Sequence, residues 1–449
     1  MAIVVALLFK YFVLEISKIP SGSMQPTLMG NPETGVFDRT VVDKLSFCFR
    51  EPERFQIVVF KHPLERSRIM VKRLVGMPDE ELKIEHGDLW TRPNAHEAWR
   101  ILRRPPSVMR AAWRSLDVRG ERASWSVVLR GKDWHVHGRD VTARGDGALR
   151  FQTGAVSTIT DEYLDGYPPS IVKRLVQRDS SFGRNSVGDL RLEGEVRALP
   201  GTDVLVFKLT EGQRTYEFRL PGPRAPEGAT VEVRIRDSVA STERTERGQA
   251  FRLPAGRSVS FGVENLDDRL ALEVDGEPLL AAEIEASARQ EAALILELVG
   301  EGADLSDLRA FRDVYYLTPE AGSPWTVKIP PGNYVMLGDN TQDSADGRLW
   351  KAKTYFLRNE DGEQVNVRGN YREGENPARG TLSDGAPAER FRDQWGEIHW
   401  FGPGAALQGL RPNVEDSPLV PRELILGRAL AVFWPIRPFD GLWRVGWLR

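Results

Sequence analysis

The sequence predicts a mainly β chain with more than one folding unit, and two observations support this prediction. First, 449 residues with 41% hydrophobic content exceed what a single core needs, so two or three cores are expected. Second, short segments in which apolar and polar residues alternate recur along the chain, each bounded by proline, glycine or charged residues. The formal charge of −3, from 61 basic and 64 acidic residues, gives no polycationic surface, so nucleic acid is not an expected partner.

The N-terminal segment, residues 1–17, is a candidate membrane helix. It is apolar apart from Lys10 and Glu15, but it is shorter than the roughly 20 residues that span a bilayer core. It lacks the basic start and the small-residue cleavage site of a secretory signal peptide, so we expect it to be retained. A longer start upstream of Met1 would complete the span, and a buried helix of a soluble protein is the alternative.

Short β-branched segments follow the apolar N-terminus. Residues 55–63 and 67–78 predict strands, and residues 82–90 predict a hairpin that turns at Gly87. Cys48, the single cysteine, is expected to be a packed strand residue. One cysteine alone excludes an intramolecular disulfide and a cysteine-based metal cage.

The middle of the chain predicts an antiparallel sandwich. Residues 98–119 are helix-like but interrupted by Pro105 and Pro106, which indicates a connector. From residue 120 to 326, strand-like segments recur at intervals of about ten residues, as in a concanavalin-type jelly roll, which this region resembles. Along residues 269–274 the leucines and the valine are expected to face the core, and the alternate residues the solvent.

Three separated motifs indicate one chemistry. The motif "KIPSGSMQPTL" (18–28) presents a hydroxyl-rich turn, and "VMLGDNTQDSADGRLW" (335–350) is a strand followed by a turn rich in Asp, Asn and Ser. In "IMVKRLVGMP", Lys72 lies on an apolar strand, where burial disfavours the ammonium form and lowers the pKa. A neutral lysine can serve as the base for a serine nucleophile. Taken singly, the motifs also fit an ordinary turn, a lysine reaching solvent from a strand edge, and an Asx-rich loop.

Together and in this order, the motifs resemble the sequence boxes of type I signal peptidases, the membrane-bound Ser/Lys endopeptidases that remove signal peptides. The segments "TVVDKLSFCFREPERFQIVVFKHP" and "VPRELILGRALAVFWP" are similar to further strands of that family. The resemblance covers residues 1–92, 327–350 and 419–436. It implies a signal-peptidase antiparallel β catalytic core, with an N-terminal membrane helix and an inserted jelly-roll-like β-sandwich.

The chain is therefore expected to contain catalytic parts separated by insertions. Residues 351–418 are rich in Gly, Asn, Asp, Arg and Pro, so they are expected to be irregular or to form a small β excursion. The expected units are the membrane helix (1–17), the first catalytic part (18–97), the connector (98–119), the inserted sandwich (120–326), the second catalytic part (327–350), the second insertion (351–418), and the third catalytic part with the C-terminal tail (419–449).

The resemblance also implies a role for each site residue. Ser23 matches the nucleophile and Lys72 the general base, while the Ser21 hydroxyl and the Ser23 backbone N–H match the oxyanion hole. Ser344 matches the serine that orients the lysine. The other matches are the supporting polar residues Arg73, Asp339, Asp346 and Arg348, and the substrate-binding residues Met24, Leu28, Ile69, Met70 and Val71. No cofactor and no metal is implied.

Several residues depart from the family pattern. Phe55 and Gln56 stand where glycine and aspartate are usual, and Asp79 stands where glycine is usual. In the third motif, Thr341 replaces a usual arginine and Gly347 a usual serine. These changes affect turns and local bracing, and they leave the nucleophile and the base in place.

The implied substrates are the signal peptides of secretory precursors, and the implied location is the plasma (inner) membrane. A single-pass anchor would hold the catalytic domain on the extracytoplasmic side, beside the lipid bilayer, where precursors are presented. Trp434, Trp443 and Trp447 lie among arginines, a composition that suits the headgroup region, although a packed terminal tail explains them equally well. The inserted sandwich could carry a ligand of its own.

Two other functions compete with the peptidase. One is a membrane-tethered protein that binds carbohydrate or another ligand on an inactive protease scaffold. The other is a self-cleaving Ser/Lys protein of the repressor type, against which the apolar N-terminus counts. The pair His135 and His137 could bind a metal, but a surface strand explains it better because no carboxylate or cysteine completes the site.

Overall fold

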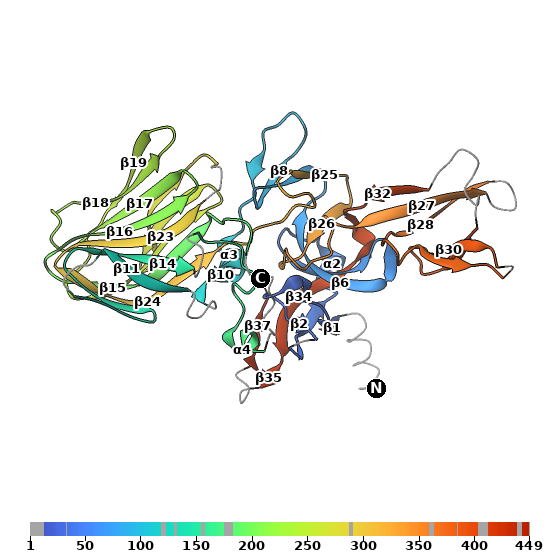
Figure 1. Cartoon of the computed structure of the whole chain (residues 1–449), viewed down its shortest axis with the longest axis horizontal. Helices are drawn as coiled ribbons and strands as arrows, with labels where there is room; N and C mark the ends of the chain where they lie inside the picture. The colour runs from blue at the N-terminus through green and yellow to red at the C-terminus, as the bar shows by residue number, and fades with distance from the viewer. Residues whose placement is uncertain are drawn as a thin grey trace.

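The fold is known from a computed structural model of the chain. It describes residues 13–448 apart from residues 33, 118–122, 130–132, 154–157, 175–182, 287–290, 359–362, 384, 403–411 and 438–441. The described residues are mainly strand, and their sheets are antiparallel, which confirms the predicted fold class at this level. Figure 1 shows a central core sheet between the sandwich on one side and a smaller β unit on the other.

The central core sheet combines strands from both ends of the chain. In spatial order it contains β1 (Leu14–Lys18), β4 (Arg39–Asp43), β34 (Ile425–Trp434), β5 (Ile57–His62), β6 (Glu65–Gly76), β26 (Asn333–Leu337) and β33 (Leu419–Pro421), with β37 (Gly446–Trp447) paired to β34. Short elements surround it, namely η1 (Gly22–Met24), β2 (Gly30–Asn31), β3 (Val36–Phe37), α2 (Ser46–Phe49), η3 (Arg422–Leu424), β35 (Ile436–Arg437) and β36 (Leu442–Trp443).

A four-stranded sheet extends from the core sheet toward the sandwich. Its strands, in order, are β25 (Trp325–Ile329), β7 (Glu80–Glu85), β8 (Asp88–Arg92) and β9 (Arg100–Ile101). The predicted hairpin is confirmed, because β7 and β8 are joined through His86 and Gly87, which both have positive φ. A two-residue turn with two positive φ angles matches the right-handed twist of paired strands.

The connector is only partly helical. Helix α3 (Pro106–Ala112) begins at Pro106, a position that tolerates proline because its missing N–H needs no partner there. The next strand, β10 (Arg114–Ser115), already pairs with β24 of the sandwich. The domain boundaries predicted from the sequence stay a prediction.

The sandwich consists of two antiparallel sheets. One contains β12 (Asp133–His137), β13 (Asp140–Arg144), β24 (Gly302–Arg312), β15 (Leu190–Ala198), β20 (Ser258–Leu266), β21 (Arg269–Val274) and β22 (Glu277–Glu283), with β10 beside β24. The other contains β11 (Ala123–Leu129), β14 (Gly147–Thr153), β23 (Ala292–Gly300), β16 (Thr202–Glu211), β17 (Arg214–Pro221), β18 (Thr230–Asp237) and β19 (Thr242–Ala250).

The inner faces of these two sheets form one hydrophobic core. Phe207 on β16 and Phe261 on β20 meet across it, with ring centroids 4.7 Å apart. Leu270, Leu272 and Val274 of β21 are buried in this core, as the alternation predicts. Every residue of the core lies between Leu116 and Ala310, so the sandwich has its own apolar interior.

Residues 351–418 form small sheets, consistent with the predicted β excursion. One sheet contains β28 (Gln364–Asn370), β27 (Lys351–Arg358) and β32 (Asn413–Asp416), and the other contains β29 (Ala378–Thr381), β30 (Pro387–Arg392) and β31 (Ile398–Phe401). Aromatic packing among Tyr355, Phe391 and Phe401 holds the two sheets together.

The structure corrects the predicted N-terminal helix over its last residues. Residues 14–17 belong to strand β1, which pairs with β4, and Glu15 forms a 2.5 Å ion pair with Lys44. These residues form a strand and not a helix because "LEIS" alternates apolar and polar residues with period two. Residues 1–12 lie outside the described residues. Within the described ranges, no helix combines the length and the apolar character that crossing a membrane requires.

The prediction for Cys48 is wrong. This residue lies in the short helix α2 and is exposed, not packed in a strand. Asp43 explains the local turn, because its carboxylate accepts hydrogen bonds from the backbone N–H groups of Leu45 and Ser46 and from the Ser46 hydroxyl. Such local bonds from a side chain to the backbone favour a turn over a continued strand.

Candidate active site

Pairing within the core sheet brings the three sequence motifs together. On β6, Lys72 lies opposite Val58 of β5, and the next residue, Arg73, lies opposite Leu337 at the end of β26. The chain that leaves β26 therefore enters its polar turn beside Lys72. We call this turn, residues 338–348, the Asp-rich loop.

Lys72 is buried in this setting. Its side chain is 1% exposed, and burial lowers the pKa of the ammonium group to about 8, although the Asp346 carboxylate partly opposes the shift. The cations Arg348 and Arg68 lower the pKa further. A lysine with such a pKa is neutral in a useful fraction of molecules near neutral pH, which a general base requires.

Ser23 lies within reach of this lysine. It occupies the 3-10 turn η1 in the segment 20–28, which we call the serine loop, and a short hydrogen bond joins Lys72 Nζ to Ser23 Oγ. Ser21 precedes η1 in an extended conformation and is exposed. The arrangement places a serine hydroxyl next to a lysine that could act as its base, and it leaves the Ser21 hydroxyl accessible from solvent.

The Asp-rich loop is held by a buried ion pair. Arg348 donates to both carboxylate oxygens of Asp346 at 2.7 and 2.8 Å, and Asp346 also accepts from the Gly338 N–H at 2.9 Å. Burial by itself raises the pKa of Asp346, but the Arg348 charge and these hydrogen bonds outweigh it and lower the pKa. The Ser344 hydroxyl, which the resemblance expects to orient Lys72, donates its hydrogen bond to Asp346 at 2.8 Å. A Cβ at Gly338 would overlap Ser344 and the Ser23 carbonyl, so this position requires glycine.

A second buried ion pair connects β6 to the serine loop. Arg73 binds Asp339 through two hydrogen bonds of 2.6 and 2.7 Å, and the Thr27 hydroxyl donates to the same carboxylate at 2.6 Å. Burial raises the pKa of Asp339, but the Arg73 charge and hydrogen bonds prevail and hold the pKa at about 2. The anionic Asp339 thus links both loops to the strand that carries Lys72.

The predicted substrate-binding residues differ in exposure. Met24 and Leu28 are buried in a small core beneath the serine loop, against which Val71 packs. Ile69, by contrast, is 55% exposed, and Met70 is half-buried. Their roles toward a substrate stay a prediction.

Sequence reasoning missed two residues of this site, Thr27 and Asn340. Asn340 donates from its side chain to the Gly22 carbonyl at 3.1 Å and from its backbone N–H to the Ser23 carbonyl at 3.2 Å. Thr27 lies inside the motif "SMQPTL", and Asn340 lies inside the motif "GDNTQ". Their polar side chains were the available signal, but their partners lie more than 300 positions away, where no local pattern shows them.

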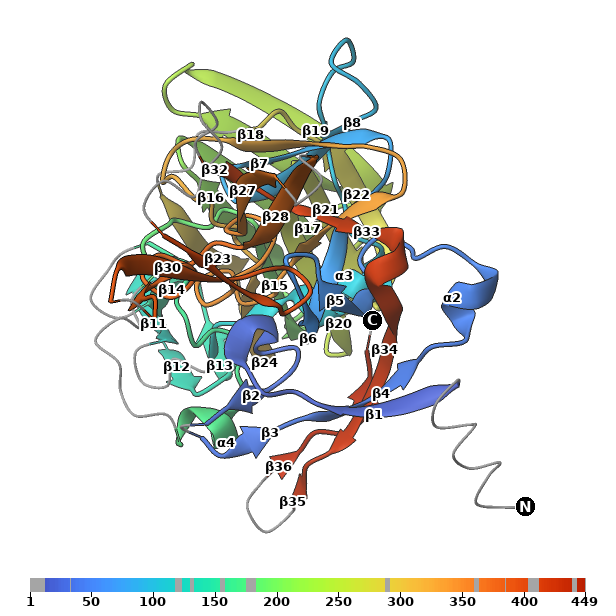
Figure 2. The ribbon, with the colours of Figure 1, turned by 90° about the vertical axis from the view of Figure 1, so that its right-hand side faces the viewer.

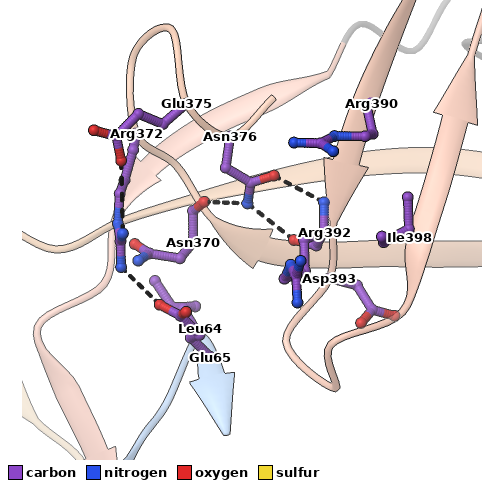
Figure 3. Close-up of a pocket in the computed structure, with 10 residues that line it drawn as sticks. All are labelled: Leu64, Glu65, Asn370, Arg372, Glu375, Asn376, Arg390, Arg392, Asp393 and Ile398. Carbon is purple, nitrogen blue, oxygen red and sulfur yellow. Dashed lines mark hydrogen bonds and ion pairs between the residues drawn. The ribbon is translucent and has the colours of Figure 1, made fainter. Parts of the chain in front are cut away.

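A separate pocket lies where the second insertion meets the β5–β6 turn. Its volume is about 140 Å³, and Figure 3 shows its lining residues. Glu65 at the start of β6 pairs with Arg372 at 2.7 Å, and Asn376 bonds to the backbone of Asn370 and Arg392. The Glu65–Arg372 pair attaches the insertion to the β5–β6 hairpin, whereas the Asn376 bonds lie within the insertion. None of these contacts involves Ser23 or Lys72.

Among the described residues, two clusters of side chains with possible metal-ligand atoms could by their spacing hold a cation. They are Asp393 with Glu397 and His399, and Asp88 with Asp189 and Asp267. Neither cluster includes a residue of the Ser23–Lys72 site. Carboxylates that lie close together do not by themselves identify a metal site.

The sequence comparisons concern the N-terminal part of the chain. Residues 1–100 match the family described as signal peptidase, peptidase S26. A probable signal peptidase I-2 of Synechocystis sp. is 35% identical over 95 residues, which cover 20% of this chain and 40% of the relative. Signal peptidase I of Leptolyngbya laminosa is 37% identical over 95 residues, covering 19% and 43%. A probable thylakoidal processing peptidase 2 of Arabidopsis thaliana is 35% identical over 95 residues, covering 20% and 24%.

The N-terminal part of the chain, which contains Ser23 and Lys72, is therefore similar to the peptidase S26 family over residues 1–100. Its bacterial relatives named above are signal peptidases, and the chain resembles type I signal peptidases. The chain spans less than half of the length of these relatives.

Comparison with solved structures adds little. A carbohydrate-binding module of Bacillus subtilis aligns over 42% of this chain and 97% of its own length, with 11% identity and a TM-score of 0.27. Porphyranase B of Zobellia galactanivorans aligns over 45% and 93%, with 11% identity and a TM-score of 0.29. Scores this low support no inference about the fold or the ligand of this chain.

Proposed function

We propose that this chain is an endopeptidase that removes signal peptides from secretory precursors by means of a Ser23–Lys72 dyad. The observation that carries the proposal is the hydrogen bond between Lys72 Nζ and Ser23 Oγ. It occurs at a lysine whose pKa is lowered to about 8 by burial, so the base can be neutral. The peptidase S26 match over residues 1–100 supports the same activity.

The reaction follows from these groups. Ser23 Oγ attacks the scissile carbonyl while neutral Lys72 accepts its proton, and the oxyanion is stabilised by the Ser23 N–H and the Ser21 hydroxyl. The resulting Lys72 ammonium gives a proton to the leaving amine, so the amide C–N bond breaks and an acyl-enzyme ester remains. Lys72, neutral again, activates a water molecule that hydrolyses this ester and restores Ser23.

The substrate would pair along the free edge of β6. Residues 69–71 bond to β5 on one side, whereas pairing with β26 begins only at Arg73. An extended peptide can therefore add to the other side of residues 69–71 as a further strand. This places its scissile bond next to Lys72, the following residue.

The bilayer is the second proposed partner. Trp443 and Trp447 are 66% and 77% exposed, Trp434 is 37% exposed, and Ile16 on β1 of the same sheet as Trp434 is 62% exposed. Exposed tryptophans beside arginines suit the headgroup region of a membrane. The plasma-membrane location, with the catalytic domain on the extracytoplasmic side, is part of this proposal.

The proposal is tested by incubating the detergent-solubilised protein with a secretory precursor and mapping the cut by mass spectrometry. We expect one cut at the end of the signal peptide, and no cut with Ser23→Ala. An intact precursor with the unchanged protein would instead favour a ligand-binding protein on an inactive scaffold.

A further inference from the structure

Part of the inserted sandwich reaches the active site. Between β14 and β15 the chain leaves the sandwich, and residues 158–174 of this excursion, here named the inserted loop, contain helix α4 (Pro169–Val172). Tyr167 and Ile171 are buried in a cluster with Met29, Val36 and Leu442 of the catalytic part. Figure 2 shows α4 beside β3 accordingly, and Figure 1 shows it near β35.

Two tyrosines of the inserted loop bond to the machinery around Ser23. The Tyr167 hydroxyl donates to Gln25 Oε1 at 2.7 Å, and both side chains are at most 2% exposed. The Tyr163 hydroxyl accepts from Asn340 Nδ2 at 3.3 Å, and this same amide nitrogen donates to the Gly22 carbonyl at 3.1 Å. The two residues held by these contacts, Gly22 and Gln25, lie on either side of Ser23 in the sequence.

The second contact controls the direction of the Ser23 N–H. The Gly22 carbonyl and the Ser23 N–H belong to one planar peptide unit, and in a trans peptide they point in opposite directions. The Gly22 carbonyl is held by the Asn340 amide and by the Gln25 N–H at 3.0 Å. A fixed carbonyl therefore fixes the N–H that is proposed to bind the oxyanion, and such donors act through a fixed orientation.

We infer that Tyr163 and Tyr167 of the inserted loop are positioning residues for the oxyanion hole, acting through Asn340 and Gln25. This inference rests on the proposed peptidase function and extends it, since the insertion then takes part in catalysis. Tyr163 orients the amide that holds the Gly22 carbonyl, and Tyr167 anchors the other end of the turn that contains Ser23.

The test is a double-mutant cycle on precursor cleavage by the full chain. Tyr163→Phe keeps the ring and loses the hydroxyl, so we expect kcat to fall about tenfold with KM unchanged. Asn340→Ala should lower kcat about a hundredfold, the usual scale for an oxyanion-hole donor. Because Tyr163 acts through Asn340, the double variant should be no slower than Asn340→Ala. Tyr167→Phe should lower kcat in the same way as Tyr163→Phe.

The matched control is Tyr216→Phe, which removes a buried tyrosine hydroxyl that donates to Glu211 at 2.9 Å within the sandwich. We expect wild-type kcat for this control. Wild-type kcat for both Tyr163→Phe and Tyr167→Phe, or additive losses in the cycle with Asn340→Ala, would overturn the inference.

Hydrogen exchange separates failure of the inference from failure of the proposed function. A wild-type protein that cleaves no precursor refutes the peptidase proposal, but the orientation of the serine loop is still measurable. Tyr163→Phe and Tyr167→Phe should speed amide exchange in peptides covering the serine loop and Asn340, and Tyr216→Phe should not. Unchanged exchange in both loop variants would contradict the positioning role even in an inactive protein.

Discussion

At the scale of single residues, the proposed chemistry depends on one buried lysine, Lys72. Lys72 is surrounded by an anion, Asp346, and by further cations, and burial is the largest influence on its pKa. A lysine in water has a pKa of about 10.4, so the environment makes its neutral form far more abundant near neutral pH. Asp346 limits this effect, and Arg348 in turn neutralises Asp346.

This environment sets the pH dependence of cleavage. Neutral Lys72 is the active form, so kcat/KM should rise about tenfold per pH unit below pH 8 and level off above its pKa of about 8. The measurement is kcat/KM for precursor cleavage from pH 5 to 10. A level rate across this range would contradict a neutral-lysine base, and a rate that still rises tenfold per pH unit up to pH 10 would contradict the lowered pKa.

The proposed role of Ser21 predicts a partial loss of activity when its hydroxyl is removed. Its hydroxyl is exposed beside η1 and is proposed as one of two oxyanion donors. Ser21→Ala should therefore lower kcat about a hundredfold without abolishing cleavage, because the Ser23 N–H remains. Steady-state kinetics and a thermal unfolding curve test this together. Wild-type kcat in a folded Ser21→Ala protein would exclude this hydroxyl from the oxyanion hole.

At the scale of elements, the edge of β6 along residues 69–71 is the feature that we propose selects substrates. Ile69 is exposed and Met70 half-buried along this edge, while Met24 and Leu28 fill the core below it. A peptide paired here directs alternate side chains toward the protein, which involves the positions −1 and −3 from the cut.

We therefore expect small side chains at both positions, with alanine favoured. A precursor series with alanine, leucine or phenylalanine at −1 measures this preference as kcat/KM. Alanine should exceed leucine and phenylalanine by at least about tenfold, the scale of discrimination by an apolar pocket of fixed size. Equal cleavage of the leucine precursor would refute a substrate site that accepts only small side chains at −1.

The individual strands and loops also show which parts of the fold and of the site could be predicted from the sequence and which could not. The β6 strand and the β7–β8 hairpin follow from local patterns, namely β-branched runs and a turn at Gly87, and Lys72 is identified because it interrupts an apolar run. Hydrophobicity alone predicts a helix over residues 14–17, but pairing with the partner strand β4 stabilises a strand there. Tyr163 and Tyr167 had no detectable signal, since their partners Asn340 and Gln25 are 177 and 142 positions away.

At the scale of the whole molecule, the sandwich has a hydrophobic core of its own but also contacts the connector and the catalytic part. Its core draws only on residues from Leu116 to Ala310. Yet Arg104 of the connector forms a buried ion pair with Asp313 after β24, and the inserted loop packs on the catalytic part. A unit with its own core should fold alone, whereas its contacts at the boundary should couple it to catalysis.

The separate core leads to a prediction for an isolated fragment. Residues 118–320 expressed alone should be soluble and show the circular dichroism of a β protein, with a cooperative thermal transition. The inserted loop should be less protected from proteolysis in this fragment than in the full chain, because it loses its contacts with Met29 and Val36. A disordered spectrum would show that the sandwich depends on the catalytic part.

The central claim is that Ser23 and neutral Lys72 act as one catalytic dyad. The most direct measurement is precursor cleavage by purified Lys72→Arg protein, because guanidinium stays charged at any working pH and cannot accept the serine proton. The matched control is Lys328→Arg, the same change at an exposed residue of β25. We predict no detectable cut with Lys72→Arg at any pH from 6 to 10, and wild-type cleavage with Lys328→Arg. Substantial cleavage at the same bond by Lys72→Arg would remove lysine from the mechanism and contradict the assignment of the site.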